Sequence, residues 1–283
     1  MKWPDDAVVG ADAHLPDGPG DAVAPWSCTG QERHTYAIVA RLLPDPASRD
    51  RGAEIARAAC HTWRAAPVRL LPLLVLHGGP EPSPAVTDAL VTASISEQAT
   101  RAHGDLLATV GLTSYPRPRG TRRAGRPSYD GTSAAELLSA KPLGIGRLNH
   151  APEIFGALLD EGPLTFRQAA QLYNLTFRWP GRMQGVCAPL WLRHAGPRAL
   201  PRLLELMTPY LHDYAVGEYY LEGLARMGHQ ARPVLPAVTA MIERRTRIPV
   251  NDSTPDGEMR LDENLLKAAL ATRHAILADG GAP

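Results

Sequence analysis

Cysteine and lysine are both scarce in this chain of 283 residues. The three cysteines, Cys28, Cys60 and Cys187, are too few and too far apart for a disulfide framework, and no two have the spacing of a metal-binding pair. Lysine stands only at positions 2, 141 and 267, so nearly every basic residue is an arginine. This composition is typical of a GC-rich coding bias, and one arginine alone is therefore a weak sign of a binding site.

Long apolar runs and an excess of charge are also missing. The 30 basic and 29 acidic side chains leave a net charge of +1, which provides no overall field toward nucleic acid or an anionic membrane. The N-terminal segment has no apolar core of the secretory type, and the longest aliphatic run, Leu70 to Leu76, is too short to cross a bilayer. We expect a cytoplasmic protein that does not bind membranes.

No segment has the alternating, Val-, Ile- and Tyr-rich pattern of a β-strand. Apolar residues recur instead at intervals of three and four, and the pairs Thr165/Gln168 and Ser133/Glu136 have the spacing of a helix capping box. The sequence therefore predicts an all-α protein. The expected apolar stripes are Ile55, Ala59, Thr62 and Trp63; Ala102, Leu106 and Val110; Phe166, Ala170, Tyr173 and Phe177; Leu200, Leu203, Leu204 and Met207; Tyr220, Leu221, Leu224 and Met227; and Val234, Leu235, Val238, Met241 and Ile242.

Composition divides the chain into four parts. Residues 1–30 are rich in Asp, Gly and Pro, which predicts an irregular N-terminal arm, and residues 31–114 follow as N-terminal helical repeats. Residues 115–132 hold five arginines, three prolines and three glycines, which indicates an exposed loop. Residues 133–283 are expected to form C-terminal helical repeats.

The C-terminal part repeats itself at an offset of 32 residues. In each copy a glycine, Gly196 or Gly228, ends one apolar helix, and prolines follow at the start of the next. A single helix pair cannot bury its apolar stripe alone, so such pairs are expected to stack. The matched positions are Leu192, Ala195, Gly196, Ala199, Pro201, Leu203 and Leu206 against Leu224, Met227, Gly228, Ala231, Pro233, Leu235 and Val238.

The phrases "LARMG" and "ARPVLPAV" within this repeat resemble the repeat units of HEAT-like proteins. The resemblance is good over residues 190–277 and loose over residues 31–112. It implies an α-solenoid of stacked antiparallel helix pairs, in which one concave face binds partners. It implies no catalytic residue.

We therefore predict a non-catalytic binding or scaffold module that recognises a protein partner on a HEAT-like concave surface. In HEAT-like stacks the second helix of each pair usually lines that surface, so the solvent-facing rows of 197–211 and 231–247 are the candidates. These rows contain Arg198, Arg202 and Glu205 in the first segment and Arg232, Thr239 and Glu243 in the second.

Nucleic-acid binding is the alternative, and it includes the activity of a HEAT-like DNA repair glycosylase. Clustered arginines contact phosphates, with an affinity that falls as salt rises. The aromatic residues of this loop are limited to its flanks, so we favour a solvated linker. The arginines in question are Arg117, Arg119, Arg122, Arg123 and Arg126.

Catalytic and metal-binding patterns are weak. The Cys60-His61 pair and Cys187 lie in apolar helical runs, which is typical of buried thiols rather than nucleophiles. The histidines at 194, 212 and 229 lack the spacing of a zinc site on one helix. We expect no metal and no cofactor, and an enzyme is not favoured.

Overall fold

The computed structural model describes residues 29–79, 81–109, 150–178, 181–247 and 254–278. The chain divides into two compact units. Unit 1 comprises Met1–Arg117 and Arg245–Arg260, and unit 2 comprises Pro118–Arg244 and Leu261–Pro283. Serine 133 and the arginines of 115–132 lie outside the described residues.

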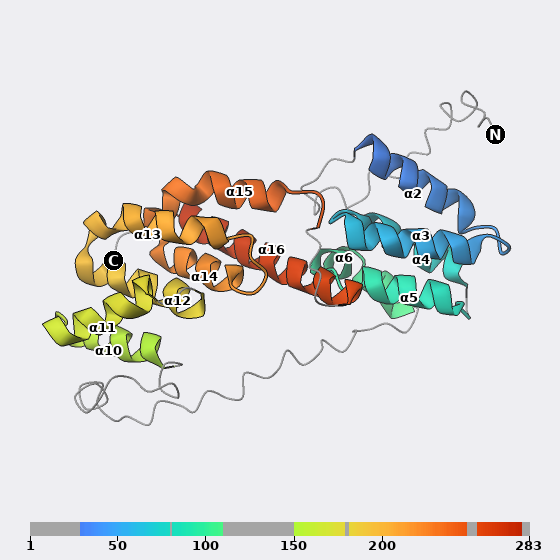
Figure 1. Cartoon of the computed structure of the whole chain (residues 1–283). Helices are drawn as coiled ribbons and strands as arrows, with labels where there is room; N and C mark the ends of the chain where they lie inside the picture. Colours follow the sequence, from blue (N-terminus) through green and yellow to red (C-terminus); the bar gives the residue numbers. More distant parts are fainter. Residues whose placement is uncertain (1–28, 80, 110–149, 179–180, 248–253, 279–283) are drawn as a thin grey trace. The chain divides into compact units, whose positions relative to one another are not determined.

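The described part of the chain is helical throughout, as the apolar spacing predicts. Helices hold 81% of these residues, and the β-structure found among them is one isolated bridge between Trp63 and Thr246. Figure 1 shows the helices and their labels. The prediction of an all-α protein is confirmed for this part of the chain.

Unit 1 is built around α3, which packs against α2, α4 and α5. The face of α3 that enters the core carries small residues, Ala53, Ala56, Ala59 and Cys60, and small side chains let neighbouring helices approach closely. The helices of this unit are α2 (Gly30–Leu42), α3 (Arg49–Thr62), α4 (Ala66–Gly78), α5 (Pro84–Ala93), α6 (Glu97–Ala102), α7 (Gly104–Thr109) and the first turns of α16 (Pro255–Leu277).

Two sequence predictions in unit 1 are wrong in detail. Of the stripe expected on α3, only Ala59 is fully buried, because the helix turns its small residues inward instead. The helix expected after residue 96 is broken at His103, whose Nε2 lies 2.8 Å from the carbonyl oxygen of Val68. The break rotates the second segment, so that Leu107 is buried and Leu106 is 37% exposed.

Residues 245–247 form an extended strap against the end of α3. The backbone amide of Arg64 donates to the carbonyl of Arg245 at 2.9 Å, and that of Arg247 donates to the carbonyl of Thr62 at 2.9 Å. The guanidinium of Arg245 forms an ion pair with Glu32, which is buried on α2. Backbone pairing and this ion pair together join the strap to the N-terminal helices.

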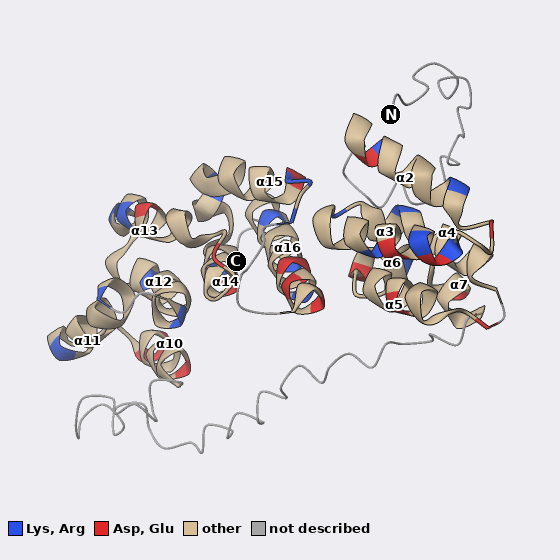
Figure 2. Cartoon of the chain, turned by 45° about the vertical axis from the view of Figure 1, so that its right-hand side comes forward, with Lys and Arg blue, Asp and Glu red and all other residues tan. Residues whose placement is uncertain are grey.

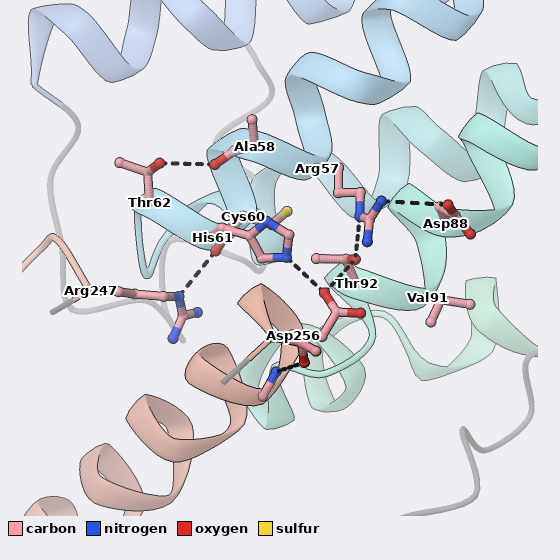
Figure 3. Close-up of polar contacts among 12 residues, drawn as sticks. Arg57, Ala58, Cys60, His61, Thr62, Asp88, Val91, Thr92, Arg247 and Asp256 are labelled. Atoms are coloured by element: carbon pink, nitrogen blue, oxygen red, sulfur yellow. Dashed lines mark hydrogen bonds and ion pairs between the residues drawn. The ribbon is translucent and has the colours of Figure 1, made fainter. Parts of the chain in front are cut away.

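A polar network joins the first turn of α16 to α3 and α5. Oδ1 of Asp256 lies 2.7 Å from Nε2 of His61 and accepts a hydrogen bond of 3.1 Å from Thr92. Figure 3 shows Thr92 between Asp256 and Arg57, and Arg57 in turn reaches Asp88. Burial by itself raises the pKa of Asp256, but the hydrogen bonds from His61 and Thr92 outweigh it and hold the pKa below its ordinary value.

We expect the Asp256→Asn substitution to destabilise the protein at pH 7 by about 1–2 kcal/mol, because it removes a charged hydrogen-bond acceptor. A lowered pKa makes this contribution complete above the pKa of the unfolded chain and removes it as the pH falls through the folded-state pKa. The difference in the free energy of unfolding between the wild type and the Asp256→Asn variant should therefore shrink in acid. Urea unfolding followed by circular dichroism at pH 7 and pH 3 measures it.

Asp88→Asn is the matched control for this substitution. Asp88 pairs with Arg57 at 3.5 Å and its side chain is 63% exposed, so its loss should cost less than about 0.5 kcal/mol. An equal loss of stability in the two variants, or a loss of stability in Asp256→Asn that does not depend on pH, would contradict the role given to Asp256.

Unit 2 is built around α12, which packs against α10, α11, α13 and α14. Figures 1 and 2 both show α12 between α11 and α14. The elements of this unit are α10 (Ala151–Glu161), α11 (Phe166–Phe177), α12 (Arg182–Ala195), η1 (Pro197–Ala199), α13 (Leu200–Met207), η2 (Thr208–Tyr210), α14 (Gly217–Met227), η3 (Gly228–Val234), α15 (Leu235–Glu243) and the rest of α16.

Glycines end α10, α12 and α14, and the last two belong to the sequence repeat. Gly196 ends α12 with φ at 78°, and Gly228 ends α14 with φ at 56°, a backbone conformation that side chains with a Cβ rarely adopt. Both glycines were expected to end helices from the sequence repeat. The capping box predicted at Thr165 and Gln168 is also present at the start of α11.

The contact between α12 and α14 is made by glycines. A Cβ added to Gly223 would lie 2.2 Å from the carbonyl oxygen of Gly185, and one added to Gly185 would lie 2.5 Å from the carbonyl oxygen of Tyr219. Distances this short are incompatible with a side chain, and the atoms in the way belong to the backbone. Glycine is therefore required at both positions by the closeness of the two helices.

The Gly223→Ala substitution should destabilise the protein by roughly 2–3 kcal/mol, because the added methyl group forces α12 and α14 apart. Gly156→Ala is the control, since Gly156 lies inside α10 and a Cβ there would meet no atom within 4 Å. This control should be stabilising by up to about 1 kcal/mol through helix propensity. Thermal and urea unfolding compare the two, and a neutral Gly223→Ala would contradict the close packing described.

Candidate functional site

The solvent-facing side of α11 is apolar. The sequence predicted instead that these apolar residues face the core. Phe166 is 92% exposed, Ala170 is exposed, and Tyr173 and Phe177 are half-buried. The residues that α11 buries are Leu172, Leu175 and Thr176. The predicted stripe of Phe166, Ala170, Tyr173 and Phe177 therefore lies at the surface instead of in the core, because the leucines occupy the face that meets the neighbouring helices.

Aromatic rings from α11 and α12 gather beside this face. The ring centroids of Tyr173 and Phe177 are 4.7 Å apart, and Trp191 of α12 lies 5.4 Å from Tyr173 and 5.8 Å from Phe177. His194 follows Trp191 on α12, with 5.4 Å between the two rings. The two contacts of Trp191 with Tyr173 and Phe177 are edge-to-face, a geometry that aromatic pairs prefer.

Arg202 of α13 lies on these rings. The central carbon of its guanidinium is 4.4 Å from the ring centroid of Phe177 and 5.8 Å from that of Tyr173. One of its nitrogens donates to the Tyr173 hydroxyl at 3.2 Å. Within the described part of the chain, no carboxylate pairs with Arg202. We name the group of Phe166, Tyr173, Phe177, Trp191, His194 and Arg202 the aromatic-arginine surface.

The helices that carry the aromatic-arginine surface are basic. Residues 166–207 contain six arginines, no lysine and a single acidic residue, Glu205, whereas the whole chain has a net charge of only +1. Figure 2 shows basic residues on α11, α12 and α13. One of the six, Arg193, is already neutralised, because it lies 2.7 Å from Asp160 of α10.

The six residues predicted to contact a partner lie on four elements. Arg198 is on η1, Arg202 and Glu205 are on α13, Arg232 is on η3, and Thr239 and Glu243 are on α15. All but the half-buried Thr239 are exposed. The structure brings Arg202 alone of these six into the aromatic-arginine surface, and Arg198 lies one helical turn before it. The five arginines of the predicted phosphate-binding loop lie outside the described residues.

The two cysteines in the described part of the chain are buried. Cys60 is fully buried, and burial, with a smaller effect of the Glu153 charge, raises the pKa of Cys187 to about 12. No group of three His, Cys, Asp or Glu residues could hold a metal ion there. No described helix is both long and apolar enough to cross a membrane.

A groove of about 470 Å³ lies between α14 and α16. Its lining mixes small residues with charges of both signs, and Glu222 in it already pairs with Arg226. The lining residues are Glu218, Glu222, Ala225, Asn264, Lys267, Ala268, Ala271 and Thr272.

Comparison with protein-family models, with curated proteins and with solved structures finds no match to this chain. The HEAT-like resemblance of the sequence therefore remains a prediction, and the geometry of the aromatic-arginine surface is the basis for a functional proposal.

The contact between Arg202 and Phe177 can be tested without a partner. Arg202→Ala should destabilise the protein by about 0.5–1 kcal/mol, the usual value of an exposed cation–π pair. Arg232→Ala removes an exposed arginine that makes no hydrogen bond or ion pair within the described residues, and it should change stability by less than about 0.5 kcal/mol. Urea unfolding compares the two. If Phe177→Leu abolishes the effect of Arg202→Ala, the pair is the cause; additive effects would contradict it.

Proposed function

We propose that this chain is a non-catalytic binding module for a protein partner and that the aromatic-arginine surface contacts that partner. The observation that carries the proposal is the exposed aromatic face of α11, with Arg202 lying on it and pairing with no carboxylate of the described chain. Aromatic residues and arginine are enriched in the cores of protein interfaces and dominate their binding energy.

The arrangement of this surface supports binding rather than a structural role alone. Single exposed apolar residues are common on soluble proteins, but contiguous apolar patches mark interaction sites. Phe166, Ala170, Tyr173 and Phe177 follow one another along a single face of α11. Trp191 and Arg202 extend that face onto two further helices.

The proposal keeps the HEAT-like solenoid as the architecture. Its support is the packing of α12, the first helix of one pair, on α14, the first helix of the next, together with the contact of α13 with η3, the segment that leads into α15. The glycines that end α12 and α14 stand at equivalent positions of the repeat. In such a stack Arg198, Arg202 and Glu205 lie on the second helix of a pair, which is the concave side.

Nucleic-acid binding is the second candidate, and the six arginines of residues 166–207 favour it. Binding of single strands uses aromatic faces on which bases stack. On this surface the ring of Phe177 is covered by Arg202, and Tyr173, Phe177 and Trp191 contact one another. The protein partner therefore explains the arrangement better.

Site-specific photo-crosslinking tests the proposal. A photoreactive phenylalanine at position 166 should capture a protein in cells that make this chain, because the position is 92% exposed and belongs to the proposed contact. The same group at His274, which is exposed on α16, is the control and should capture that protein at least tenfold less.

Other outcomes of this experiment have definite meanings. Capture that is removed by nuclease would favour the nucleic-acid alternative. Equal capture at both positions, or capture only at His274, would show that the aromatic-arginine surface is not the binding site.

A further inference from the structure

We infer that the partner presents an acidic segment that also carries apolar side chains to the aromatic-arginine surface. This inference rests on the proposed function, and it adds the chemistry of the partner. It follows from the placement of positive charge around the aromatic rings, as described next.

Arginines stand at both ends of the apolar face of α11, and a further arginine lies beside its C-terminal half. Arg167 follows Phe166 at one end, Arg178 follows Phe177 at the other, and both are exposed. Arg202 lies against the rings from α13. The distance along the helix from Phe166 to Phe177 is about 16 Å at 1.5 Å per residue, which corresponds to three helical turns of a bound segment.

The arginines of this region differ in their internal pairing. Arg193 is neutralised by Asp160, but Arg198 and Arg202 make no ion pair within the described residues, and Glu205 is the one acidic residue between 166 and 207. Carboxylates of a partner would satisfy these guanidinium groups. Complementary charge raises the association rate and selects among partners.

The guanidinium of Arg202 is prepared for such a carboxylate. It lies on Phe177 and donates one hydrogen bond to Tyr173, so its orientation is set before binding. A guanidinium has five N–H donors, and the remaining ones can hold a carboxylate through two parallel hydrogen bonds. An orientation fixed in advance reduces the entropy lost on binding.

Apolar side chains are required in the same segment. Phe166 is almost fully exposed and carries no charge, so carboxylates alone would leave it in water. Covering it removes apolar area from water, which is favourable.

A second copy of this chain fits this surface poorly. A symmetric contact through the same face of both copies would place arginine opposite arginine.

A selection of peptides tests the inference without knowledge of the natural partner. A displayed library of random 16-residue peptides is selected on the full chain and, in parallel, on the Arg202→Glu, Phe166→Ser and Arg33→Glu variants. Arg33→Glu is the matched control, since it reverses the charge of an exposed arginine on α2, outside the residues predicted to contact a partner. Circular dichroism verifies that each variant is folded.

We expect peptides that combine Asp or Glu with aromatic or aliphatic residues to be enriched on the wild type and on Arg33→Glu. For a labelled enriched peptide, Arg202→Glu and Phe166→Ser should each weaken binding at least tenfold, and Arg33→Glu should change it less than twofold. Replacing the acidic residues of the peptide by Asn and Gln should also weaken binding at least tenfold. Fluorescence anisotropy measures these affinities.

The results that overturn the inference differ from those that overturn the proposed function. Enrichment of neutral or basic peptides that still depend on Phe166, or no enrichment at all, rejects the acidic partner. Enriched peptides that depend on neither Phe166 nor Arg202 reject the surface itself, as does loss of binding in Arg33→Glu equal to that in Arg202→Glu. Binding of a random 20-nucleotide RNA that is tighter than the peptide and lost in Arg202→Glu assigns the surface to nucleic acid. Self-association lost in Arg202→Glu assigns it to a second copy.

Discussion

The glycine contact between α12 and α14 is the packing constraint in unit 2 on which the candidate site depends. Gly185 and Gly223 bring the two backbones so near that no side chain fits between them. The same helix α12 carries Trp191 and His194 and packs against α11 and α13. A displacement of α12 would therefore move the rings of Trp191 away from Tyr173 and Phe177. The aromatic-arginine surface would then lose the ring contacts that Trp191 provides.

A buried chain of hydrogen bonds holds the start of α12 in the same place. The amide of Gly181 donates to the Tyr220 hydroxyl at 2.8 Å, which donates to Gln184 at 2.6 Å, and Gln184 donates to the carbonyl of Thr176 at 2.9 Å. Burial raises the pKa of Tyr220, so its hydroxyl keeps the proton that it donates. The network joins α11, α12 and α14 and complements their apolar packing.

Sequence periodicity predicted the helices well where leucine and methionine define the stripe. All the residues of α14 that were predicted to face the core are buried. Nearly all of the residues predicted to face the core on α13 and α15 are buried as well. It failed on α11, where two apolar faces compete and the leucines, not the aromatics, meet the neighbouring helices. The aromatic-arginine surface could not be predicted either, because Phe177, Trp191 and Arg202 come together only through the packing of three helices. The capping box and the helix-ending glycines were predictable, because they depend on local backbone geometry.

A structural role for Arg202 accounts for only part of the surface. Long arginine side chains commonly cover apolar groups, and Arg202 covers Phe177 in this way. That role does not extend to Phe166, which lies eleven positions before Phe177 on the same helix and remains almost fully exposed. The two cysteines of the described residues, by contrast, are buried. Aromatic rings and a guanidinium that pairs with no carboxylate of the described chain lie where solvent reaches them, and this distribution supports the binding proposal.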